Sequence, residues 1–109
     1  MIKSIVMFKR KPGMDVREFQ RYWREEHPKV VMQLPGIRRY VQSHPTLESY
    51  RNGREPAYDA VAEVWWDDFE ALRVSSHSDA WPLVAADETH FIDASTRTLL
   101  ITQEHVIAE

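Results

Sequence analysis

The first strand-like segment, residues 2–8, is apolar on both of its alternating faces, and this feature limits the possible folds more than any other. Val6 and Phe8 share one face of the segment, whereas Ile5 and Met7 share the other. Successive side chains of a strand point to opposite sides, so both sides of this strand need cover from water. A layer of helices covers one side of a sheet, and we therefore expect another layer against the second side.

Four strand-like and two helical segments follow one another in the order strand, helix, strand, strand, helix, strand. Asp15 and Glu18 have the spacing of a capping box at the start of the first helix, and Leu34-Pro35-Gly36 ends this helix. Further strands are expected over residues 37–44, 58–66 and 97–107, and a second helical region over residues 67–88, capped by Asp67 and broken near His77.

This order predicts an α+β, ferredoxin-like βαββαβ fold, a four-stranded antiparallel sheet with the helices on one face. The length of 109 residues suits one domain over residues 1–109. The other sheet face would remain wet, so we predict a homodimer in which a second copy covers that face. The polar connection over residues 45–56 is the expected place for a mobile lid.

Charge and composition exclude several classes of protein. A net charge of -3 gives no basic footprint for nucleic acid, and no apolar run approaches the roughly 20 residues that cross a bilayer. The first residues lead directly into a strand without the plan of a signal peptide, so we expect a cytoplasmic protein. Without cysteine there is no disulfide, thiolate nucleophile or Cys-based zinc site, and other side chains must provide any chemistry.

His27 is the first candidate for chemistry, because it lies on the apolar stripe of a helix directly before a proline. It follows Phe19 and Trp23 in steps of four, which directs all three side chains toward the sheet. Pro28 lacks an N–H group, so the Arg24 carbonyl loses its helical partner and His27 is expected to leave α-helical geometry. Such a bend can open a gap with an imidazole on its wall, suited to general acid–base work. A buried structural histidine is the alternative.

Other candidates lie on the predicted strands. Tyr40 and His44 share one strand face and can look into the same cavity, where a tyrosine can hold a substrate oxygen. Asp59 can orient a histidine or stay solvated at an edge. Trp65 and Trp66 point to opposite faces, so that one can line a pocket while the other packs at the dimer contact. The structural alternatives are core packing for the aromatic residues and a surface position for His44.

Residues near the end of the second helical region include ligand types for metals, namely Asp87, Glu88, His90 and Asp93. Their spacing matches neither the H-E-x-x-H motif nor an EF-hand, so we expect a solvated, acidic helix end and no metal site. Walker, dinucleotide-binding and G-x-S-x-G motifs do not occur, and we expect no cofactor.

Five segments, FQRYWREEHPKVV, LPGIRRYVQSH, YDAVAEVWWDDFEAL, ADETHFID and TQEHVI, resemble in order and spacing the EthD family, named for ethyl tert-butyl ether degradation. The resemblance covers nearly the whole chain and implies a dimeric α/β barrel, in which two ferredoxin-like protomers join their sheets. By this resemblance His27 matches the family's histidine before proline, and Asp59 matches the acid of its Tyr-Asp-Gly-Val motif. Ala60 replaces the glycine, which adds a methyl group where the family's backbone is bare.

The superfamily that this resemblance implies includes muconolactone isomerases, cofactor-free monooxygenases, polyketide cyclases and haem-handling proteins. Our leading interpretation is a small catabolic enzyme that isomerises, dehydrates or oxygenates a compact, apolar, oxygenated metabolite without a cofactor. The alternative is a non-catalytic dimeric module that binds a hydrophobic small molecule, and haem ligation by a histidine is a third interpretation. The residues assigned to the enzyme are, as catalytic groups, His27, Tyr40 and Asp59 and, as substrate-binding groups, Trp23, His44 and Trp65.

Overall fold

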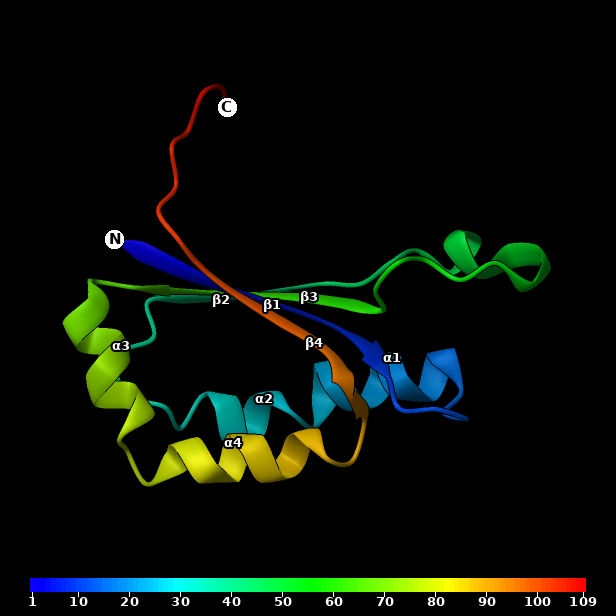
Figure 1. The fold of residues 1–109 in the computed structure, drawn as a ribbon, viewed down its shortest axis with the longest axis horizontal. Coiled ribbons are helices and arrows are strands. Elements are labelled where there is room, and N and C mark those ends of the chain that lie inside the picture. Colours follow the sequence, from blue (N-terminus) through cyan, green and yellow to red (C-terminus); the bar gives the residue numbers. More distant parts are fainter.

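The computed structural model describes all 109 residues and contains one four-stranded antiparallel sheet with every α-helix on the same face (Figure 1). The strand order is β2-β3-β1-β4, which confirms the predicted ferredoxin-like α+β fold. No helix is both long enough and apolar enough to cross a membrane. The elements are β1 (Ile2–Arg10), α1 (Val16–Glu25), α2 (Pro28–Val31), β2 (Arg39–Ser43), η1 (Leu47–Gly53), β3 (Ala60–Trp66), α3 (Phe69–Ser76), α4 (Ala80–Glu88) and β4 (Ile92–Thr102).

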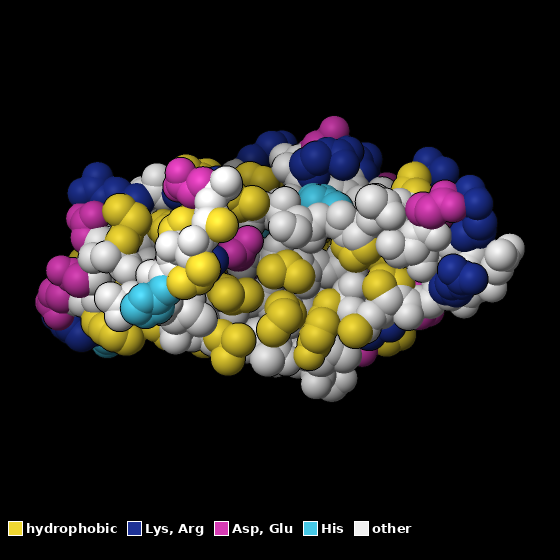
Figure 2. All heavy atoms as spheres, turned by 90° about the horizontal axis from the view of Figure 1, so that it is seen from above, with side chains coloured by type: hydrophobic (Ala, Val, Ile, Leu, Met, Phe, Trp, Pro, Cys, Tyr) yellow, Lys and Arg dark blue, Asp and Glu magenta, His cyan; other side chains and the backbone are white.

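The two faces of β1 have different surroundings. Phe8 and Val6 face the helices, where Phe8 is 2% exposed and Val6 packs against the same cluster. Ile5 and Met7 alternate with them and therefore point to the outer face of the sheet, which no helix of this chain covers (Figure 1). Figure 2 looks onto this face and shows apolar side chains gathered at its centre. The alternation predicted for this strand is confirmed.

Two clusters of buried apolar side chains fill the space between the helices and the sheet. In the first, aromatic rings from β1, from α1 and from Phe91, directly before β4, meet with centroid separations of 5.6 to 6.1 Å, mostly in edge or tilted geometry. The second lies under α2, where the chain turns toward β2. The first cluster consists of Phe8, Phe19, Trp23, Ala60, Phe91 and Ile92, and the second of Val31, Leu34 and Trp66.

The first helix breaks at His27, as predicted, and continues as α2. The N–H group of His27 donates to the Tyr22 carbonyl at 3.1 Å, five residues back, so the Trp23 carbonyl is left without it. Gln42 of β2 takes this place and donates from Nε2 to the Trp23 oxygen at 2.7 Å. The expected departure of His27 from helical geometry was wrong, because its φ and ψ are -61° and -36°. A shift in hydrogen-bond register makes the bend instead.

The second helical region divides into α3 and α4 at His77, as predicted. The residue that caps α3 was predicted one position too early. Asp68 accepts a hydrogen bond from the Ala71 N–H group at 2.8 Å, whereas Asp67 forms a surface ion pair with Arg38. Both aspartates suit a cap by type, but only Asp68 makes the cap, while Asp67 is paired with Arg38.

The last strand begins and ends about five residues earlier than predicted. β4 pairs with β1 along most of its length, with a shift in register between Met7 and Lys9. At this bulge the Lys9 N–H group donates to Thr96 Oγ1 at 2.8 Å. The polar residues before position 97 therefore belong to a bulged strand instead of a loop. Residues 103–109 follow β4 without regular secondary structure.

The connection between β2 and β3 carries η1 and extends beyond the end of the sheet (Figure 1). Asp59, fully buried at 0% exposure, anchors this connection. Its carboxylate accepts hydrogen bonds from Tyr50 Oη at 2.6 Å, from Arg10 Nη1 at 2.9 Å and from the Arg10 N–H group at 2.7 Å. The predicted alternatives for Asp59, orienting a histidine or solvation at an edge, were both wrong, because three donors surround its carboxylate.

We predict that Asp59→Asn destabilises the protein by about 3 kcal/mol, because it leaves the partly buried Arg10 guanidinium without its buried counter-charge. Asp67→Asn is the matched control, since it breaks an exposed ion pair and should leave the unfolding midpoint close to that of the wild type. Chemical denaturation of the two variants and the wild type measures the difference. Equal unfolding midpoints for both variants would contradict the anchoring role of Asp59.

Candidate functional site

A cavity of about 120 Å³ lies between the helices and the sheet, beside the bend in the first helix. Twelve of its sixteen lining residues are hydrophobic, and Trp23, Trp66 and Val84 contribute walls from three different elements. His27 and Tyr40 bring polar groups to this apolar lining. A concave, mostly apolar site with a few convergent polar groups is the usual form of a small-molecule site.

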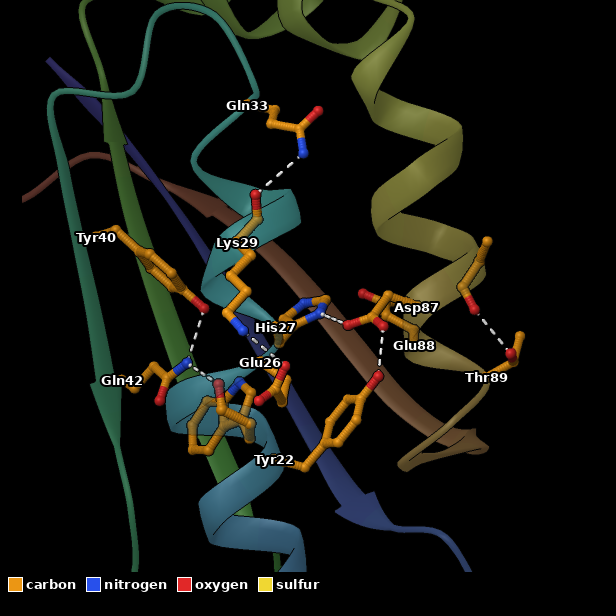
Figure 3. A network of polar contacts seen from close by, with 12 residues as sticks. Tyr22, Glu26, His27, Lys29, Gln33, Tyr40, Gln42, Asp87, Glu88 and Thr89 are labelled. Atoms are coloured by element: carbon orange, nitrogen blue, oxygen red, sulfur yellow. Dashed lines mark hydrogen bonds and ion pairs between the residues drawn. The ribbon is translucent and has the colours of Figure 1, made fainter.

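His27 stands on the wall of the cavity and is 5% exposed. Its Nδ1 atom lies 2.7 Å from Asp87 Oδ2, and its ring meets Phe91 edge-on at 4.8 Å (Figure 3). An ionised carboxylate only accepts hydrogen bonds, so Nδ1 carries the proton and donates it to Asp87. Nε2 has no hydrogen-bond partner within the chain and is not among the fully buried atoms. This nitrogen is therefore free to accept a proton from a bound molecule.

Asp87 links His27 to Tyr22. Tyr22 Oη donates to Asp87 Oδ1 at 2.6 Å, and this hydrogen bond, together with burial, raises the pKa of Tyr22 to about 12. Burial works against ionisation of Asp87, but the hydrogen bonds from Tyr22 and His27 outweigh it and hold the pKa of Asp87 below its usual value. Asp87 is thus a carboxylate at neutral pH and fixes the orientation and tautomer of the imidazole.

The interpretation of Asp87 as part of a solvated helix end was wrong, since its side chain is 17% exposed and engaged on both oxygens. One signal in the sequence points to it. Asp87 follows Trp81 and Val84 in steps of three, which places it near the face of α4 that lines the cavity. The structure brings no three His or carboxylate side chains together as a metal site, and Asp87 contacts His27 instead of His90 or Asp93.

Tyr40 lines the cavity from β2 and extends toward His27 from the opposite side (Figure 3). Its Oη atom accepts a hydrogen bond from Gln42 Nε2 at 2.9 Å. Burial raises the pKa of Tyr40, so the phenol stays protonated at neutral pH. Because the lone pairs of this oxygen serve Gln42, its own O–H group is available to donate to an oxygen atom of a ligand.

His44 shares this strand face but does not line the cavity. Its ring packs on the indole of Trp23 at a centroid separation of 4.3 Å, and its Nε2 atom lies 2.9 Å from Gln42 Oε1. Burial lowers the pKa of His44, which favours the neutral ring. Trp23 lines the cavity as predicted, and His44 supports it from behind.

The two adjacent tryptophans point to opposite faces of the sheet, as predicted, but Trp66 takes the position expected for Trp65. Trp66 lines the cavity and donates from Nε1 to Ser4 Oγ at 3.2 Å. Trp65 lies on the outer face, where Nε1 donates to Glu104 Oε1 at 2.5 Å and the Arg39 guanidinium stands 4.7 Å from its ring. The register of β3 against β1 determines which indole faces inward.

Two further residues lie away from the cavity. Asp59 is bound to Arg10 and Tyr50, and the structure does not bring it to His27. The methyl group of Ala60 packs within the first core cluster, whereas Ala62 lines the cavity. The methyl group that Ala60 adds therefore fills the core and leaves the lining of the cavity unchanged.

Comparison with known proteins gives a consistent result. Residues 11–95 match the EthD domain, and a comparison with curated protein sequences found no match. An EthD family protein from Bacillus halodurans has a similar structure, with a TM-score of 0.76, 22% identity and coverage of 96% of this chain and 99% of that chain. SnoaB, a cofactor-independent oxygenase from Streptomyces nogalater, gives a TM-score of 0.67 at 16% identity, covering 99% of this chain and 97% of that one. A dimeric ferredoxin-like protein from Bacteroides fragilis gives 0.67 at 11% identity, with coverage of 94% and 95%.

We predict that Asp87→Asn flattens the acid side of the stability profile. The pKa of Asp87 is lower in the folded than in the unfolded chain, so its contribution is present above about pH 4 and is lost as the pH falls further. At neutral pH the variant should lose about 1–3 kcal/mol, because two hydrogen bonds to a charged group are weakened.

Thermal unfolding between pH 2.5 and pH 7 measures this prediction. The gap between wild type and Asp87→Asn should narrow below pH 4, where the wild-type carboxyl also becomes neutral. Asp79→Asn, at an exposed position whose side chain makes no cap, is the control and should follow the wild type throughout. A gap that stays constant with pH would refute the role of the Asp87 charge.

Proposed function

This chain belongs to the EthD family, and we propose that it is an enzyme that acts on a compact, largely apolar, oxygenated metabolite through proton transfer at His27. The observation that carries the proposal is the pairing of Asp87 with Nδ1, which leaves Nε2 unpartnered beside an apolar cavity. In the proposed site Asp87, and not Asp59, orients the histidine. Trp23 serves as an apolar wall of the site, whereas His44 and Trp65 do not contact the ligand.

The proposed first step moves one proton. Nε2 of His27 accepts a proton from a C–H or O–H bond of the substrate, and the electron pair of that bond moves toward the substrate oxygen. The imidazolium that results is stabilised by the Asp87 carboxylate at 2.7 Å. Tyr40 donates its O–H group to the oxygen on which charge develops, in a site whose apolar walls strengthen the interaction.

An enolate or phenolate formed in this way can be reprotonated elsewhere, lose a leaving group, or react with molecular oxygen. These outcomes correspond to isomerisation, dehydration and oxygenation without a cofactor. SnoaB, which has the same fold, is named a cofactor-independent oxygenase, and this supports oxygenation as a reaction that the fold accommodates.

We also propose that the protein is a homodimer formed through the outer face of the sheet, with residues 1–109 of each copy acting as one domain. Apolar side chains from three strands lie on this face, among them Met7, Val61 and the 48% exposed Leu100 (Figure 2). An apolar sheet face left in water is unfavourable, and a second copy with the same face is a suitable cover. The Bacteroides fragilis relative is itself described as dimeric.

For the enzymatic proposal, we expect His27→Asn to lower turnover by about 10²- to 10⁴-fold while ligand binding persists. Substrates are first sought among neutral phenols, ketones and lactones by thermal stabilisation, since a ligand at about 100 times its Kd adds roughly 2.7 kcal/mol. Hits are then assayed for turnover, with oxygen consumption recorded to identify an oxygenase. His105→Asn, in the exposed tail, is the matched control.

Full turnover by His27→Asn would disprove the role of this histidine. Ligands that bind to the wild type without any conversion, in the presence of oxygen and across pH 5 to 9, would favour the non-catalytic binding module. Both outcomes are distinguishable because the thermal shift reports binding and the assay reports conversion.

For the dimer, light scattering after size exclusion should give about twice the chain mass of 12.9 kDa for the wild type. Leu100→Glu places a charge on the outer face and should shift the protein toward the monomer, because burial of an unpaired charge is costly. Leu83→Glu, on α4 and exposed to the same extent at 48%, should remain dimeric. A monomeric wild type at micromolar concentration would refute the proposal.

A further inference from the structure

A groove between α4 and β4 joins the cavity, and we propose that it holds the apolar body of an elongated, neutral ligand whose oxygen-bearing head lies at His27 and Tyr40. This inference rests on the proposed function and extends it by naming the shape and charge of the substrate. It assigns a binding role to residues that the proton-transfer step leaves unused.

The size of the cavity is the first argument. Its volume of about 120 Å³ is well below the roughly 300–1,000 Å³ of common ligand pockets. The adjoining groove has a volume of about 580 Å³, which brings the combined space into that range. The two spaces are continuous, since six residues line both of them: Ser4, Val6, Trp81, Ala85, Glu88 and Arg97.

The position of apolar side chains is the second argument. Leu99 and Ile101 of β4 stand opposite Val6 and Ser4 of β1 and thus face the helix layer of the sheet. They are nevertheless 51% and 38% exposed, and Trp81 of α4 across the groove is 37% exposed. Side chains on the inner side of a sheet are usually covered by a helix. The strip formed by Leu99 and Ile101 is not covered by any helix of the chain, so a ligand can cover it.

The charges of the groove indicate a neutral ligand. Its only ionisable lining groups are Glu88 and Arg97, and Arg97 Nε donates to Glu88 Oε1 at 3.1 Å. These side chains are 20% and 36% exposed and stand where the groove meets the cavity. Because the charges of Glu88 and Arg97 compensate each other, neither side chain needs a charged group of the ligand as its partner. An alkyl or aryl body beyond an oxygen-bearing head matches this pattern.

The probes for the test are phenol, 4-propylphenol and 4-hexylphenol, titrated into the whole protein by calorimetry and by NMR of the histidine rings. Phenol should bind weakly and move the His27 resonances. Each added methylene should lower the Kd by about two- to fourfold until the groove is filled, as expected for burial of an apolar chain.

Leu99→Ser should reduce the gain with chain length, raising the Kd of 4-hexylphenol about tenfold, and leave the Kd of phenol unchanged. Leu83→Ser is the matched control, because Leu83 is similarly exposed but lines neither space. Ile101→Ser tests the same strip independently and serves in place of Leu99→Ser if that variant does not fold.

The outcomes separate the two proposals. If phenol binds and moves the His27 resonances but the Kd does not change with chain length, the groove proposal is overturned and the proposed function stands. If none of the three phenols binds, the groove proposal is overturned, and the proposed function is decided by the turnover assay with ketones and lactones. A fall of the Kd with chain length that Leu99→Ser or Ile101→Ser reduces, and Leu83→Ser does not, supports the groove as the second part of the site.

Discussion

The arrangement of the site depends on the register shift that begins the bend at His27. Because the His27 N–H group bonds to Tyr22, the Trp23 carbonyl is open to Gln42, whose amide then also serves Tyr40 and His44. One side chain on β2 thus fixes the distance between the helix and the strand. Pro28, at the next position, lacks an N–H group and prevents the regular helical hydrogen bonds from re-forming. The backbone itself therefore maintains the gap between the helices and the sheet.

This gap has a cost in stability, which indicates that it serves a purpose. Side chains that wall a cavity of about 120 Å³ forgo the contacts that a close-packed interior would give them. The chain has large aromatic residues nearby and uses them to wall the cavity instead of filling it. Asp87 adds a further cost through its desolvation, which donation from Tyr22 and His27 offsets. Features of this kind concentrate at functional sites.

Local patterns were sufficient to predict the fold, the helix break and the cavity positions of His27, Trp23 and Tyr40, because each depends on spacing within one element. Other features depend on contacts between distant elements. Asp87 acquires its role only when α4 packs beside α2 and brings it to His27, sixty residues away in sequence. Alternation shows that Trp65 and Trp66 face opposite sides of the sheet. Which of the two indoles faces the helices depends on how β3 pairs with β1.

The apolar character of β1 on both faces now has a specific explanation. Val6 and Phe8 form part of the cavity floor, while the intervening Met7 lies on the face that we assign to the dimer. The floor of the site and the proposed subunit contact are therefore two sides of one strand, separated only by the thickness of the sheet. Burial of Met7 would restrict the motion of the neighbouring residues that contact the ligand. In the proposed dimer, β1 is therefore the structural link between the subunit contact and the floor of the cavity.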